Sequence, residues 1–119
     1  MNNQTLKIGN NRGRPRVWID RAEYLNGAGF TVGARYDVRY LPGDGIVLTL
    51  DPDGARKVAQ KSGTRPVIDL CSQSVGWALG QSATRADVSF HGNFIAIKPA
   101  IQERTDDADP MPTAEGYIE

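Results

Sequence analysis

The stretch ARYDVRYLPGDGIVLTL, residues 34–50, determines how the rest of the chain is interpreted. Apolar and polar residues alternate up to Leu41, a Pro-Gly-Asp-Gly segment follows, and an apolar run begins again at Ile46. Two such runs joined by a Pro/Gly/Asp turn are typical of a β-hairpin. Each strand is expected to place alternate residues on one face: Tyr36, Val38 and Tyr40 in the first, and Ile46, Leu48 and Leu50 in the second.

The second half of the chain repeats this plan about fifty residues later. In each half a strand, a short helical segment and a hairpin follow one another. Repetition at a nearly fixed spacing indicates one unit written twice, and a chance likeness of two hairpins is the alternative. The matching positions are offset by 49, 50 and 49 residues: Ile19-Asp20 with Ile68-Asp69, Asp37-Val38 with Asp87-Val88, and Ile46 and Leu48 with Ile95 and Ile97.

The sequence therefore predicts a mainly β fold in which two tandem hairpin units, with short helical turns, form a small barrel or pseudo-dimer. Leu6 and Ile8 are the only apolar anchors expected in the N-terminal segment. The tail is rich in acids and prolines, so it is expected to be disordered. The expected segments are a basic arm (1–15), a first β unit (16–50), a basic linker (51–64), a second β unit (65–99) and an acidic tail (100–119).

Composition restricts the class of protein. A chain of 119 residues forms one domain with a modest core. It contains neither an apolar run long enough for a membrane helix nor a secretory leader pattern. Its single cysteine, Cys71, has no disulfide partner and no neighbours at zinc-site spacing. We expect a cytoplasmic protein that uses no metal and no other cofactor.

The charge is distributed unevenly although its sum is zero. Residues 1–99 hold 13 basic and 8 acidic residues, whereas residues 100–119 hold one basic and six acidic residues. A body with net charge +5 suits a partner that is a polyanion, and the alternative is a solubilising tail on a mildly basic domain.

The first unit also resembles a known family. Its Leu-x-x-Ala-Gly-Phe run leads through a glycine into a strand, a turn and an Ile/Leu-rich strand, as in the SymE-like branch of the AbrB/MazE superfamily. The second unit keeps the strand pattern but lacks Ala-Gly-Phe. The resemblance implies a swapped-hairpin barrel and a role as a DNA-binding regulator or antitoxin, or as an RNA-directed toxin. The matching positions are Leu25, Ala28, Gly29, Phe30, Gly33, Val38, Ile46 and Leu48.

A second resemblance covers residues 7–99, which look like the N-terminal extension of some phage-encoded cytosine methyltransferases. The methylation chemistry does not carry over, because Cys71 follows a leucine rather than the proline of the nucleophile dipeptide. A Gly-rich cofactor loop after a strand is also missing. This resemblance favours a phage or mobile-element protein that is not an enzyme.

Basic residues are the candidate contacts for nucleic acid, because phosphate binding needs only accessible Lys and Arg. Arg12-Gly13-Arg14-Pro15 is the core of an AT-hook, an extended segment that lies in the DNA minor groove. The alternative is that each Arg-Pro begins a strand, since proline favours an extended backbone. The candidate residues are Lys7, Arg12, Arg14, Arg16, Arg35, Arg39, Arg56, Lys57, Lys61 and Arg65.

Other residue types give weaker indications. Trp18 and Trp77 suit base stacking, although core positions are favoured for both. Asp20 and Asp69 occupy equivalent places in the two units, where accepting backbone N–H bonds or capping the following turn is favoured over a catalytic pair. The single histidine is expected in a hairpin turn, and Cys71 is expected to be at least half-buried at a strand end.

These observations lead to a DNA-binding, non-enzymatic regulator of a phage or mobile element as the first hypothesis. The alternative is an inhibitor that binds a host CRISPR or restriction protein complex. A second alternative is a SymE-like, RNA-directed toxin. A homodimer is compatible with each hypothesis.

Overall fold

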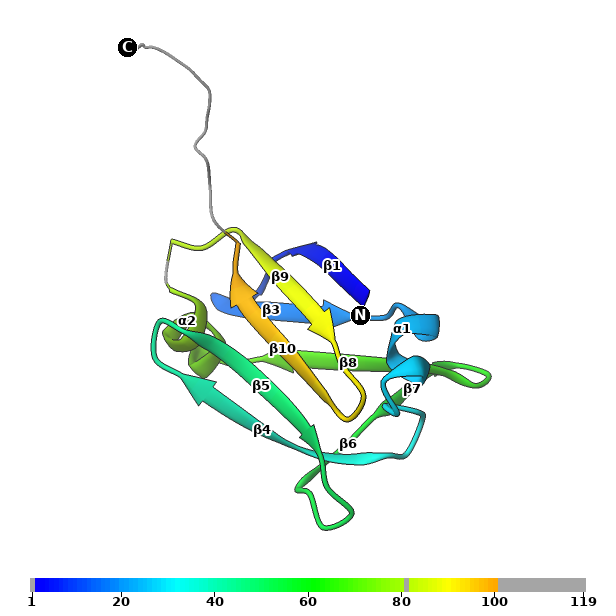
Figure 1. Ribbon diagram of the computed structural model, residues 1–119. Helices are drawn as coiled ribbons and strands as arrows, with labels where there is room; N and C mark the ends of the chain where they lie inside the picture. Colours follow the sequence, from blue (N-terminus) through cyan, green and yellow to red (C-terminus); the bar gives the residue numbers. More distant parts are fainter. Residues whose placement is uncertain (1, 81, 101–119) are drawn as a thin grey trace.

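The computed structural model describes residues 2–80 and 82–100, which form two β-sheets packed face to face (Figure 1). One sheet has the order β1-β9-β10-β5-β4-β6 and the other has the order β2-β3-β8-β7. The strands are β1 (Asn2–Lys7), β2 (Gly9–Asn11), β3 (Arg14–Ile19), β4 (Arg35–Leu41), β5 (Gly45–Leu50), β6 (Arg56–Lys57), β7 (Ala59–Ser62), β8 (Arg65–Cys71), β9 (Arg85–Phe90) and β10 (Phe94–Pro99). This confirms the expected mainly β fold.

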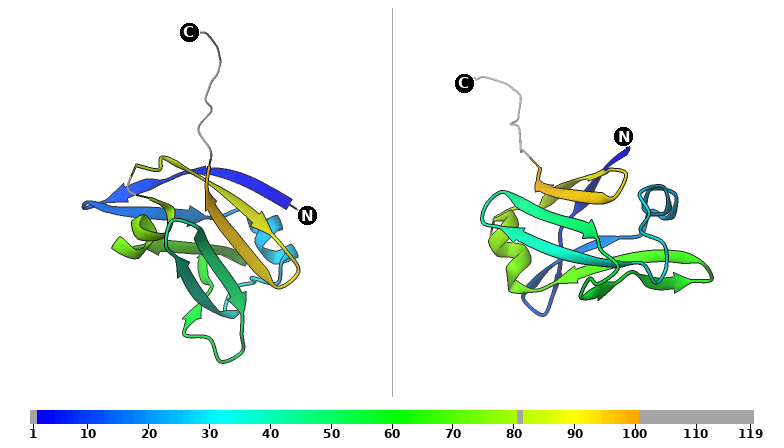
Figure 2. Two further views of the ribbon diagram at one scale, coloured as in Figure 1. Left: turned by 60° about the vertical axis from the view of Figure 1, so that its left-hand side comes forward. Right: turned by 60° about the horizontal axis from the view of Figure 1, so that its bottom comes forward.

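Two short helices close the ends of the sandwich. They are α1 (Ala22–Gly27) and α2 (Gln73–Leu79), and all three views in Figures 1 and 2 place them at opposite ends. Helix α1 packs against β8 and β9, and α2 packs against β3, β4 and β5. Each helix therefore contacts strands that belong to the other half of the sequence.

The hairpin expected from residues 34–50 is confirmed. β4 and β5 pair antiparallel from Tyr36↔Leu50 to Leu41↔Gly45. Tyr36, Ile46 and Leu48 are buried, while the alternate residues of β4 are mostly exposed. The alternation of residue types thus predicts both the pairing and the buried face.

The two halves of the chain are joined by one strand pair in each sheet. β3 pairs antiparallel with β8 at Ile19↔Ile68, and β5 pairs antiparallel with β10 at Val47↔Ala96. Both residue pairs are 49 positions apart in the sequence. Each ladder therefore contains one residue pair at the spacing of the sequence repeat, although the separation changes by two at every step of an antiparallel pair.

The sheets do not close into the expected barrel. β1 and β6 are the edges of one sheet, and β2 and β7 are the edges of the other. At Ile8 and at Val58 the chain passes from one sheet to the other. The backbone amide of Ile8 donates to Thr84, and that of Val58 donates to Ala34.

The N-terminal segment and the linker are more regular than the sequence indicates. Residues 2–7, expected to be part of an arm, form β1 and pair with β9. Leu6 and Ile8 pack against the core, as expected of anchors. Within the expected linker, β6 and β7 are short paired strands. The expected acidic tail lies, from residue 101 onward, outside the described residues.

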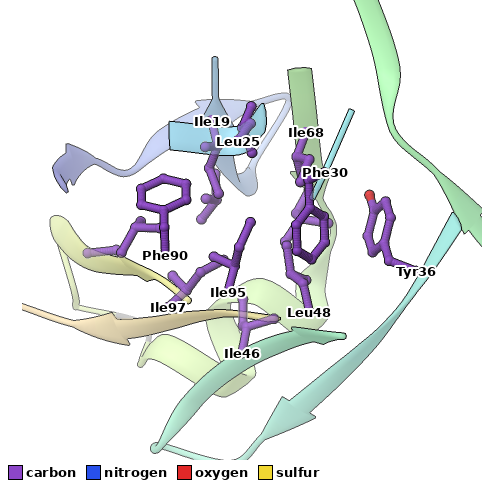
Figure 3. Close-up of a cluster of buried hydrophobic side chains, with 14 of the residues drawn as sticks. Ile19, Leu25, Phe30, Tyr36, Ile46, Leu48, Ile68, Phe90, Ile95 and Ile97 are labelled. Carbon is purple, nitrogen blue, oxygen red and sulfur yellow. The ribbon is translucent and has the colours of Figure 1, made fainter. Parts of the chain in front are cut away.

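The core fills the space between the two sheets (Figure 3). Ile19 and Ile68 face it from the four-stranded sheet, and Ile95 faces it from the six-stranded sheet. Phe30, in the loop after α1, is fully buried among them. Because the inner faces of both sheets are apolar and shared, the outer faces point in opposite directions. No helix in the described ranges is long and apolar enough to span a membrane.

Gly45 is a point where the two hairpins approach too closely for a side chain. Its φ is +125°, and a Cβ there would collide with the carbonyl oxygen of Ile97. Gly43 in the same turn has φ +69°, with no atom within 4 Å of the position a Cβ would take. Substitutions at these two glycines therefore distinguish the effect of backbone strain alone from that of strain combined with a steric collision.

Gly45→Ala is expected to lower the free energy of unfolding by about 2–6 kcal/mol, because strain and overpacking add. The matched control, Gly43→Ala, is expected to cost only about 1–2 kcal/mol, because it introduces left-handed strain alone. Urea unfolding followed by circular dichroism measures both. Equal losses for the two variants would contradict the close contact between β5 and β10.

Candidate nucleic-acid interface

The outward side chains of the six-stranded sheet form a broad surface, which we call the six-stranded face. In β9, Ala86, Val88 and Phe90 are buried. Because successive residues of a strand point to opposite sides, Arg85 and Asp87 point outward. No described element lies in front of β9, β10, β5 and β4 in Figure 1, so this side of the sheet is uncovered.

Basic residues are spread over the whole six-stranded face. Four of them were candidates from the sequence, and two, Arg85 and Lys98, were missed. All six residues are exposed. The set is Lys7, Arg35, Arg39, Lys57, Arg85 and Lys98.

The missed residues depend on pairing between distant parts of the chain. Lys7 lies directly opposite Arg85 in the β1–β9 pair. Lys98 lies on β10, which pairs with β9 on its other side. The signal in the sequence was a basic residue at an outward position of each strand of the second hairpin.

The two acids on the six-stranded face already accept hydrogen bonds. Asp87 accepts from the Thr5 hydroxyl at 2.9 Å, and Asp37 accepts from the Ala55 amide at 3.1 Å. Neither acid makes an ion pair with a described residue. Arg35 donates to the Gly54 carbonyl oxygen at 2.9 Å, which fixes its side chain at one end of the face.

Small side chains occupy the middle of this face. Ser89, Ala96 and Val47 lie in one row across β9, β10 and β5, and Arg39 continues the row on β4. A groove of about 520 Å³ lies beside Ser89, and its lining includes Thr5, Asp87 and Lys98. A flat centre flanked by cations allows a phosphate backbone to approach closely.

The outward side chains of the four-stranded sheet, with the turn between β2 and β3, form a second basic surface, which we call the four-stranded face. Its strands bury Val17, Ile19 and Leu70 on the other side. Five sequence candidates lie here: Arg12, Arg14, Arg16, Lys61 and Arg65.

Ion pairs neutralise two of these five cations. Arg16 binds Asp69 through Nε and Nη2, both at 2.9 Å, and Lys61 Nζ lies 2.7 Å from Asp20. The hydrogen bond from Lys61 is the main reason that the pKa of Asp20 lies below its usual value, and a hydrogen bond from Trp18 acts in the same direction. The Arg16 guanidinium also lies over the Trp18 ring, 4.6 Å from its centroid.

Of the roles expected for Asp20 and Asp69, helix capping is not observed, because neither α1 nor α2 has a side-chain cap hydrogen bond. A backbone hydrogen bond is among the causes that lower the pKa of Asp20. Each carboxylate also binds its own cation across the four-stranded sheet. Alternation in a strand identifies an outward carboxylate, but only the pairing of distant strands identifies its partner.

The Arg-Gly-Arg-Pro segment is folded into a hairpin rather than extended. Arg12 and Gly13 form the turn between β2 and β3, with φ of 56° and 82°. The Gly13 amide donates to Asn10 Oδ1 at 3.0 Å, which holds the turn. β3 begins at Arg14 and β8 begins at Arg65, so the interpretation of Arg-Pro as a strand start is confirmed.

The core positions favoured for the two tryptophans are wrong. Trp18 is 37% exposed on the four-stranded face, and Trp77 is 56% exposed on α2. Trp18 lies opposite Asp69, on the outward side of β3. Aromatic character in a strand does not itself distinguish the inner face from the outer one.

Arg56 joins neither basic surface. It pairs in register with Tyr36 at the sheet edge, so the two side chains share the inward side. Burial raises the pKa of Tyr36, and a hydrogen bond from Arg56 partly opposes that effect. This candidate residue therefore contacts the phenol at the edge of the core.

The single histidine and the single cysteine of the described residues are both engaged in the packing of the sheets. His91 stacks on Phe94 with ring centroids 4.1 Å apart, and its Nε2 lies 3.1 Å from the Ser89 hydroxyl. Cys71 is half-buried at the end of β8, as expected. Within residues 2–80 and 82–100 no three His, Cys, Asp or Glu residues are grouped for metal binding.

Comparisons of the chain with protein-family models, with curated proteins and with solved structures find no match. The functional argument therefore depends on the two basic surfaces themselves.

Lys61→Ala is expected to lower the free energy of unfolding by less than about 1 kcal/mol at pH 7, because the ion pair is partly exposed. Asp20 has a depressed pKa in the folded protein, so it stabilises the fold above the unfolded pKa near 4. That contribution is lost as pH falls through the folded pKa. Urea unfolding at pH 7 and at about pH 2 measures the difference.

Lys57→Ala is the matched control, because Lys57 makes no ion pair with a described residue. It is expected to leave stability nearly unchanged at both pH values. A loss for Lys61→Ala that is as large at the lower pH would show that the Asp20 ion pair is not its source.

Proposed function

We propose that this chain is a cytoplasmic, non-enzymatic DNA-binding protein that regulates a phage or mobile element. The single observation that carries the proposal is the six-stranded face, where an uncovered sheet holds six cations and two acids. Both acids are already hydrogen-bonded. Binding to phosphates releases counterions from DNA, so such a surface has affinity that falls with salt.

The interpretation of the chain as a swapped-hairpin pseudo-dimer is part of this proposal. Each of the two strand pairs contains one register pair separated by 49 residues, Ile19↔Ile68 and Val47↔Ala96, which is the spacing of the sequence repeat. A twofold axis brings a residue opposite its own counterpart in the other copy, so these two pairs support two copies of one unit related by a pseudo-twofold axis through both sheets. The packing of each helix on the other half supports an exchange of elements between the copies. One chain then supplies both halves of an AbrB-like dimer.

The absence of catalysis is proposed from the roles of the reactive side chains. Ser89 lies within hydrogen-bond distance of His91, but its hydroxyl also donates to the Ala96 carbonyl oxygen at 3.5 Å. The His91 ring is stacked against Phe94. These contacts hold the β9–β10 turn together, which is a sufficient role for both residues.

A combined variant, Arg39→Ala/Arg85→Ala/Lys98→Ala, tests the DNA proposal. The plot of log affinity against log salt is expected to become less steep by about 0.9 for each phosphate contact removed. Fluorescence anisotropy of a labelled duplex over a series of salt concentrations measures it, and the same titration with RNA tests the toxin alternative.

The matched control is Arg56→Ala, because Arg56 lies on the inward side of β6, opposite Tyr36, and so belongs to neither basic surface. It is expected to bind DNA like the unmodified protein. Absence of DNA binding by the unmodified protein at low salt would overturn the proposal.

The alternative, an inhibitor of a host defence complex, is favoured by one observation. Trp77 exposes more than half of its surface on α2, and large exposed aromatic residues are enriched at protein interfaces. A protein complex that is captured from host lysate, survives nuclease treatment and is lost in Trp77→Ala supports this alternative. Loss of every partner on nuclease treatment supports DNA.

A further inference from the structure

We propose that the four-stranded face is a second DNA-binding surface, so that one chain holds two duplexes on opposite sides. The inference rests on the proposed function and extends it from binding DNA to bridging two DNA segments. Two observations support it: the unpaired cations of the four-stranded face, and the orientation of that face relative to the six-stranded face.

The acids of the four-stranded face are already neutralised by ion pairs within it. Asp69 is bound by Arg16 and Asp20 is bound by Lys61. Three exposed arginines make no ion pair with a described residue, so they retain their full charge for an external anion. They are Arg12, Arg14 and Arg65.

These arginines lie at the two ends of the sheet. Arg14 begins β3 and Arg65 begins β8, and the two strands are antiparallel. If the register of this pair is continued past Ile19↔Ile68, position 65 lies opposite position 22. Position 22 is eight residues beyond Arg14. At about 3.3 Å per residue, the two ends are about 26 Å apart. One DNA strand carries a phosphate for about every 3.4 Å of axis, so this spacing spans several phosphates.

The hairpin turn holds its arginines rigidly at one end. Gly13 donates to Asn10, and both turn residues have positive φ, as a two-residue hairpin requires. Between the two ends, the Arg16 guanidinium lies over the Trp18 ring, 4.6 Å from its centroid. The exposed Trp18 indole lies where a bound duplex would cross the sheet.

The two basic surfaces do not compete for the same duplex. They are the outer sides of sheets that share one core, so they point away from each other (Figures 1 and 2). The acids that lie on neither surface are found in α1 and in turns: Glu23, Asp44, Asp51 and Asp53. This segregation leaves net positive charge on both faces and places negative charge at the ends and edges.

The test uses a duplex fixed to beads, the full chain, and a second duplex carrying a fluorescent label. The unmodified protein is expected to capture the second duplex, with capture falling as salt rises. Arg12→Ala/Arg14→Ala/Arg65→Ala is expected to bind the fixed duplex and to capture none of the second. Arg39→Ala/Arg85→Ala/Lys98→Ala is expected to show the same loss of capture, and Arg56→Ala is the control that captures normally.

The outcomes separate the two proposals. No binding to the fixed duplex overturns the proposed function itself. Undiminished capture by the Arg12/Arg14/Arg65 variant overturns the proposal of a second DNA-binding surface and leaves the first surface in place. In that case the two duplexes are bridged by two copies of the chain, each bound through its six-stranded face. Melting curves confirm that each variant is folded before it is scored.

Tryptophan fluorescence provides an independent measurement. Trp77→Phe leaves Trp18 as the sole tryptophan of the chain. With the Arg39/Arg85/Lys98 substitutions added, duplex DNA is expected to change the Trp18 emission. With the Arg12/Arg14/Arg65 substitutions added instead, the emission is expected to stay constant at the same DNA concentration. No change in either protein overturns the second surface.

Discussion

The antiparallel pairing of β3 with β8 and of β5 with β10 is the constraint on which the rest of the structure depends. These pairs connect the two halves of the chain, one in each sheet. Each half alone pairs its strands mainly as two separate hairpins, β2–β3 with β4–β5 and β7–β8 with β9–β10, which is too little to bury an apolar face on both sides. Joined, the halves enclose Ile19, Ile68 and Ile95, which are fully or almost fully buried. Burial of such side chains is the main source of stability in a domain of this size.

The shared core also determines where charge can lie. Since the inner faces of both sheets are apolar, ionised side chains are confined to the outer faces, the turns and the ends. The cations are spread along strands and half of the eight acids in residues 1–99 lie in α1 and in turns, so cations outnumber acids on both sheet faces. On the four-stranded face, Asp20 and Asp69 reduce this charge locally and fix the orientations of Lys61 and Arg16. The two basic surfaces thus result from the way in which the core is enclosed.

Local patterns predict the local parts of this fold. Alternation gives β4 and β5, the Arg-Pro dipeptides mark the starts of β3 and β8, and glycines end α1. Four residues of the six-stranded face were also identified from the sequence. Arg85 and Lys98 were missed because their position beside Lys7 depends on pairs formed by segments far apart in the chain. The exposure of Trp18 and the partners of Asp20 depend on tertiary packing in the same way.

The pairing of β1 with β9 has a consequence for the order of folding. Asn2 lies opposite Phe90, so β1 can pair only when β9, which is far along the chain, is available. The entropy of closing so long a loop makes this pairing a late step. During synthesis the first strand leaves the ribosome with an unsatisfied edge, which has to stay unpaired until β9 follows. The six-stranded face is therefore assembled only when nearly the whole described chain is available, and incomplete chains lack the Lys7–Arg85 part of it.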